Sequence, residues 1–127
     1  MSLDREVTDL LKALETYVAS TKRCAIHAGR VVALGQRVQV LMDLHHEMHA
    51  NLLVEHEATK EIMEATGNPT PPALTQFLAH YEEFKVVHKL LQEAVKAVGQ
   101  EKDFLDWQLN TTLPAEYAAT QKPLSGG

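Results

Sequence analysis

Residues 67–72 read GNPTPP, and they separate two long stretches in which apolar residues recur every three or four positions. Gly67 suits the left-handed residue that ends a helix, and the Asn68-Pro69 pair that follows cannot continue one. Thr70 is a good helix cap, and the proline after it fits the first position of a new helix. The stretch therefore predicts a tight turn at 67–72 between two antiparallel helices.

The chain before this turn carries an apolar stripe whose positions step by three and four, which is typical of one face of a helix or of a coiled-coil seam. The stripe comprises Leu3, Val7, Leu10, Leu14, Tyr17, Cys24, Val31, Leu34, Val38, Leu41, His45, Met48 and Leu52. No proline occurs in residues 1–68, so the sequence predicts helix over residues 3–66. Because Ser20 and Thr21 are capping residue types, one continuous helix and a break near residue 20 both stay open.

The chain after the turn carries a second stripe, made of Leu74, Phe77, Tyr81, Phe84, His88, Leu91, Val95 and Val98. Gly99 is expected to end this helix, and a short amphipathic segment is expected at 103–109. Pro114, Pro123 and the C-terminal glycines predict an extended or flexible tail over residues 111–127. Residues 1–110 then form an all-α domain, either an elongated antiparallel helical hairpin or an up-and-down bundle of three or four helices with coiled-coil-like packing.

Composition narrows the functional classes. The chain has 127 residues, 45% of them hydrophobic, with a net charge of −5 and a single cysteine. One cysteine excludes an internal disulfide framework and a cysteine-based zinc finger. The acidic balance argues against a general nucleic-acid binder. No apolar run is long enough to span a membrane and no signal peptide is recognised, so the expected location is cytoplasmic.

Charge and length point to association with other helices. A helix over 73–98 covers only about 26 residues of its predecessor, so residues 21–40 are expected to keep an uncovered apolar stripe that a second copy or a helical partner would cover. Three arginines repeat there every seven residues, and six acids lie between residues 43 and 64. The arginines form either a solvated flank or a surface that pairs with the acidic half of another chain. The predicted partner-binding residues are Arg23, Arg30, Arg37, Val31, Leu34, Val38 and Leu41.

Seven histidines are present, and three of them could meet at one ion. His45 and His49 are one helical turn apart, and a hairpin centred on the turn places His88 opposite residue 51. Such an imidazole set suits Zn²⁺, Cu²⁺ or Ni²⁺. A second candidate cluster is His56, His80 and Glu83. The alternatives are polar core residues that fix the helix register, and a pH-sensitive interface.

The motifs of catalysis are missing from the sequence: it holds no activated nucleophile, no phosphate-binding loop and no paired acid and base. No catalytic residue and no organic cofactor is therefore predicted. The sequence favours a non-enzymatic structural or adaptor protein that acts through helix–helix self-association or partner binding. One alternative is a His-ligated metal-binding or metal-dependent helical bundle. A further alternative is a small helical secretion chaperone or virion component.

Overall fold

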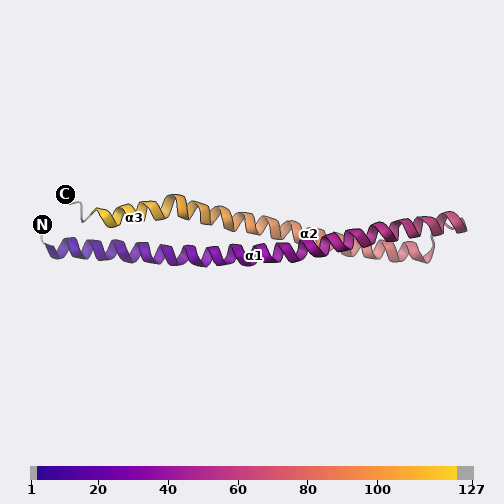
Figure 1. The fold of residues 1–127 in the computed structure, drawn as a ribbon, viewed down its shortest axis with the longest axis horizontal. Helices are drawn as coiled ribbons and strands as arrows, with labels where there is room; N and C mark the ends of the chain where they lie inside the picture. Colours follow the sequence, from indigo (N-terminus) through magenta and orange to yellow (C-terminus); the bar gives the residue numbers. More distant parts are fainter. Residues whose placement is uncertain (1–2, 123–127) are drawn as a thin grey trace. The chain divides into compact units, whose positions relative to one another are not determined.

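The computed structural model describes residues 3–122 (Figure 1). Helix α1 spans Leu3–Thr66, α2 spans Pro72–Trp107, a π-helical turn η1 spans Gln108–Thr112, and α3 spans Leu113–Gln121. No strand occurs within residues 3–122, so the fold is all-α as predicted. Helix α1 passes residue 20 without interruption, and of the two open alternatives the break is wrong.

The turn between α1 and α2 forms as its residues predict. Gly67 has a φ of 67°, and its N–H donates to the carbonyl of Met63 at 3.0 Å, which satisfies one of the last carbonyls of α1. The Asn68 side chain accepts a hydrogen bond from the Thr70 N–H at 3.0 Å and so closes the next turn. Thr70 is not the helix cap, since α2 begins at Pro72.

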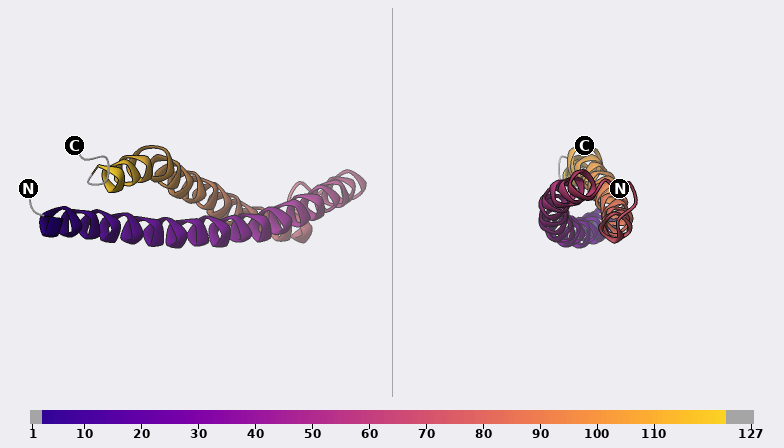
Figure 2. Two further views of the ribbon diagram at one scale, coloured as in Figure 1. Left: turned by 60° about the vertical axis from the view of Figure 1, so that its left-hand side comes forward. Right: turned by 90° about the vertical axis from the view of Figure 1, so that its right-hand side faces the viewer.

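Residues 34–97 form one compact unit, which contains the second half of α1, the turn and most of α2 (Figure 2). Leu52 and Thr59 of α1 and Ala94 of α2 are buried. The seam of this unit consists of the α1 positions that are buried or half-buried, and they step by three and four: Leu34, Val38, Leu41, His45, Met48, Leu52, Glu55 and Thr59. From Leu34 to Leu52 this is the stripe that the sequence predicts, and the seam continues beyond it through Glu55 and Thr59.

Residues 3–33 and 98–122 belong to the other compact unit. Its buried side chains are Ser20 and Cys24 of α1 and Thr120 of α3, and the rings of Tyr17 and Tyr117 lie 5.8 Å apart. Cys24 is a free thiol. All three buried side chains are small. The α1 seam of this unit comprises Glu6, Leu10, Ala13, Tyr17, Ser20, Cys24, His27 and Val31.

The C-terminal third of the chain differs from the prediction. Helix α2 continues through Gly99 to Trp107, and η1 and α3 extend the helical path to Gln121, so the predicted extended tail is wrong for residues 111–121. Pro114 stands in the first turn of α3, directly after η1. In η1 the Leu113 N–H donates to the Gln108 carbonyl, a wider turn that makes room for the proline ring. Residues 123–127 of the predicted tail lie outside the described residues.

Candidate functional site

Two of the predicted metal ligands meet in the unit formed by residues 34–97. Nε2 of His45, on α1, lies 2.9 Å from Nδ1 of His88, on α2. Both rings pack against Phe84, with centroids 4.7 Å away for His45 and 6.2 Å for His88. At this distance one imidazole donates its N–H to the bare nitrogen of the other. The contact therefore joins α1 to α2 through a single shared proton.

Desolvation lowers the pKa of His45, and the neighbouring imidazoles of His88, His49 and His46 lower it further. The neutral form of His45 is therefore favoured, as the contact with His88 requires. Protonation of both rings would place two positive charges 2.9 Å apart.

The third predicted ligand does not join this pair. His49 is exposed, and its ring centroid lies 6.0 Å from that of Phe84. Within residues 3–122, no group of three or more His, Cys, Asp or Glu side chains is arranged to hold a metal ion. The structure thus brings together His45 and His88 but supplies no third ligand beside them.

The second predicted cluster is also divided. His80 pairs with Glu55, its Nδ1 lying 2.8 and 3.0 Å from the two carboxylate oxygens. The hydrogen bond and the charge of Glu55, with a smaller effect from Glu83, raise the pKa of His80. His56 instead lies beside Phe77, with ring centroids 5.7 Å apart and the ring planes tilted by 57°. His80 and Glu83 line a common hollow of about 260 Å³, which His56 does not reach.

The other compact unit holds an ion-pair site that the sequence analysis missed. Nδ1 of His27 lies 2.5 Å from a carboxylate oxygen of Glu101, and the guanidinium of Arg30 lies 3.9 Å from the same oxygen. The edge of the His27 ring meets Phe104 at a centroid distance of 4.7 Å. The site was missed because α2 was expected to end at Gly99, before the residue that supplies the carboxylate.

The predicted partner-binding residues divide by type. The three arginines are exposed: Arg23 donates a hydrogen bond to the buried Ser20 hydroxyl at 2.7 Å, and Arg37 borders a small hollow beside Glu93 of α2. The four apolar members are half-buried within the two seams: Val31, Leu34, Val38 and Leu41. The expectation of an uncovered stripe over residues 21–40 is wrong, because the seam positions of this segment are buried or half-buried within their units.

Apolar side chains are nevertheless exposed in large numbers, at positions outside the seams. Twenty-two large ones among residues 3–122 are exposed, whereas the buried apolar residues are Cys24, Leu52, Ala94 and Pro71. The exposed set is Leu3, Val7, Leu11, Leu14, Val18, Ile26, Val32, Val40, Met42, Leu44, Leu53, Val54, Ile62, Leu78, Tyr81, Val86, Leu90, Val95, Phe104, Trp107, Leu109 and Tyr117. Two packed helices leave most of the surface of each helix exposed to solvent, and much of that exposed surface is apolar here.

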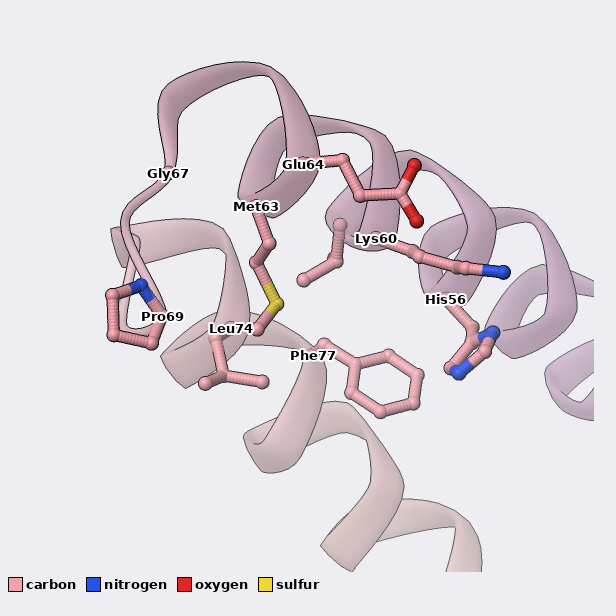
Figure 3. Close-up of a pocket in the computed structure, with 9 residues that line it drawn as sticks. His56, Lys60, Met63, Glu64, Gly67, Pro69, Leu74 and Phe77 are labelled. Carbon is pink, nitrogen blue, oxygen red and sulfur yellow. The ribbon is translucent and has the colours of Figure 1, made fainter.

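A hollow of about 590 Å³ lies at the turn (Figure 3). Met63 of α1 points toward α2, where Leu74 and Phe77 complete the apolar part of the lining. The polar side chains of the lining come from α1: His56, Thr59, Lys60 and Glu64.

Comparisons of the chain with protein-family models, curated proteins and solved structures give no match. Across the described residues, no helix has both the length and the apolar character that crossing a membrane requires.

Proposed function

We propose that this chain is a non-enzymatic helical structural protein that works by self-association through helix–helix packing. One observation carries the proposal: twenty-two large apolar side chains are exposed while four apolar residues are buried. Exposed apolar side chains that gather along one face of a helix are typical of surfaces that other proteins cover. A binding role toward a different helical protein, as an adaptor, uses the same surfaces and is the nearest alternative.

The polar groups of the seams support a structural role. His45 with His88, His80 with Glu55, and His27 with Glu101 each join α1 to α2. Pairs of this kind favour the alignment in which their two members stand opposite each other on the two helices. A structural role of this kind accounts for all three pairs of titratable side chains, and no substrate is needed to explain them.

The proposal is tested by measuring the mass of the full chain in solution. Size-exclusion chromatography with light scattering, over concentrations from about 10 to 500 μM, should give an integer multiple of 14.1 kDa. A mass of 14.1 kDa throughout this range overturns self-association. Circular dichroism on the same samples confirms that the helices are intact.

A metal-binding helical bundle is the second candidate, and the contact between His45 and His88 favours it. Two imidazoles that share one tetrahedral Zn²⁺ have their nitrogens about 3.3 Å apart, for Zn–N bonds of about 2.05 Å. The observed 2.9 Å needs a small opening of the pair to admit the ion. Stoichiometric Zn²⁺, Cu²⁺ or Ni²⁺ in the purified protein, measured by mass spectrometry, would support this candidate.

A further inference from the structure

Helix α1 carries a second apolar stripe beside its seam in the unit that contains residues 3–33. Each member follows a seam residue by one position: Val7, Leu11, Leu14, Val18, Thr21, Ala25, Ala28 and Val32. All eight are exposed and none is charged, and the five large ones are 39–60% accessible. This flank stripe lies about 100° round the helix from the seam, where another helix can pack without displacing α2 or α3.

The flank stripe is hollowed at its N-terminal half. Leu11, Leu14 and Val18 line a groove of about 430 Å³, and Glu15 and Lys22 border it. The C-terminal half contains the small residues Ala25 and Ala28 and ends at Val32. The middle of the stripe is therefore bulky at Leu11 and Leu14 and small at Ala25 and Ala28.

This asymmetry makes the stripe complementary to itself in the antiparallel direction. When residue numbers in facing positions add to 39, Leu11 meets Ala28 of a second copy, and Leu14 meets Ala25 of the second copy. In these two pairs a large residue lies against a small one, as in well-packed helix interfaces, and Val7 meets Val32 at each end of the stripe. Thr21 faces Val18 near the two-fold axis, and its hydroxyl is already satisfied by the Tyr17 carbonyl at 2.8 Å. No unpaired polar group is buried by this pairing.

The same alignment pairs the two charges at the groove. Glu15 and Lys22 each follow a stripe residue by one position and so border the stripe. In an antiparallel pair whose stripe residues face each other at a sum of 39, these bordering residues face each other when their numbers add to 37. Glu15 of one copy then meets Lys22 of the other, and the two-fold axis repeats the pair. Within one chain these residues are seven positions apart, about 10.5 Å along the axis, so they do not pair with each other.

We infer that residues 7–32 of α1 form a two-fold antiparallel interface with a second copy of this chain, closed by two Glu15–Lys22 pairs. The inference rests on the proposed self-association and adds to it the surface, the direction and the register. A point-group dimer of this kind uses the same patch on both copies, which the self-complementary stripe provides. Two helices from each copy then contribute to a four-helix arrangement at this interface.

Charge exchange on the full-length chain tests the register. Glu15→Lys places lysines opposite each other twice, and Lys22→Glu does the same with glutamates, so each single variant should weaken dimerisation about tenfold at low salt. The double variant E15K/K22E restores both pairs with reversed polarity and should return the dissociation constant to within about twofold of wild type. Asp9→Lys and Lys12→Glu are matched controls at exposed positions of α1 outside the stripe. They should change the dissociation constant of the dimer little.

A second variant tests the apolar contact. Leu14→Glu should give a monomer with unchanged helical content, because Leu14 is already exposed within its own chain. Dissociation constants come from sedimentation equilibrium and helical content from circular dichroism. If wild type self-associates but the single charge variants match the controls, or the double variant stays as weak as the singles, this interface is wrong and self-association proceeds elsewhere. If wild type is monomeric, the proposed function falls as well.

Discussion

Truncation of Leu52 tests whether the seam holds the unit of residues 34–97 together. Leu52 is 9% exposed, whereas the adjacent Leu53 is 57% exposed, so the same substitution at the two positions differs mainly in burial. Leu→Ala in a closed core costs about 2–5 kcal/mol, part of it for the cavity that remains. The seam neighbours of Leu52 on α1 are only half-buried and can partly close that cavity, so we expect a loss of about 2–3 kcal/mol.

The comparison is made by urea unfolding, followed by circular dichroism at one fixed protein concentration, since association contributes to apparent stability. Leu53→Ala should change the free energy of unfolding by no more than about 0.5 kcal/mol. Equal losses for the two variants, or a larger loss for Leu53→Ala, would show that the seam does not pass through Leu52.

Four further outcomes follow from named residues. Gly67→Ala should lower the free energy of unfolding by about 1 kcal/mol because Gly67 has a φ of 67°. Gly35→Ala, within α1, should raise it by about 0.5–1 kcal/mol, so the two variants should shift Tm in opposite directions. The lowered pKa of His45 means that its contribution to stability is present above pH 6.5 and is lost as the pH falls through that pKa, so His45→Gln should flatten the acid side of a stability–pH profile. The raised pKa of His80 means that its pairing stabilises below pH 6.5 and is lost as the pH rises through that pKa, so a persistent alkaline slope in His80→Gln would contradict this assignment. EDTA should leave Tm unchanged; a decrease that disappears in His88→Ala would instead support a metal site.

The turn, and the seam from Leu34 to Leu52, were predictable because their signals are local. Gly67 provides the backbone freedom that ends α1. Leu34, Val38 and Leu41 repeat at steps of three and four along one face, and this spacing separates them from the exposed Val40 and Met42.

The N-terminal half of α1 was harder because it carries two stripes. Val7 and Leu14 were assigned to the seam with Leu10, yet they are exposed and belong to the flank stripe. The true seam contains Ala13 and the fully buried Ser20, and hydrophobicity cannot identify a serine as an interior residue. Burial there follows from packing between helices, which sequence spacing does not report.

The polar contacts depended on register. The sequence placed His88 opposite residue 51, but in the structure it meets His45, six positions away. The site of His27 and Glu101 required α2 to continue past Gly99, where glycine was taken as a stop although a helix interior tolerates it at a cost of about 1 kcal/mol. Residue types therefore identified the participants of the histidine pair but not their alignment.

Sedimentation equilibrium of the unmodified chain tests the central claim most directly, because the exposed apolar surface either recruits a second copy or stays in water. We predict a concentration-dependent mass that rises toward twice 14.1 kDa. A single ideal species of 14.1 kDa, at every loading concentration and at both low and high salt, would contradict the account.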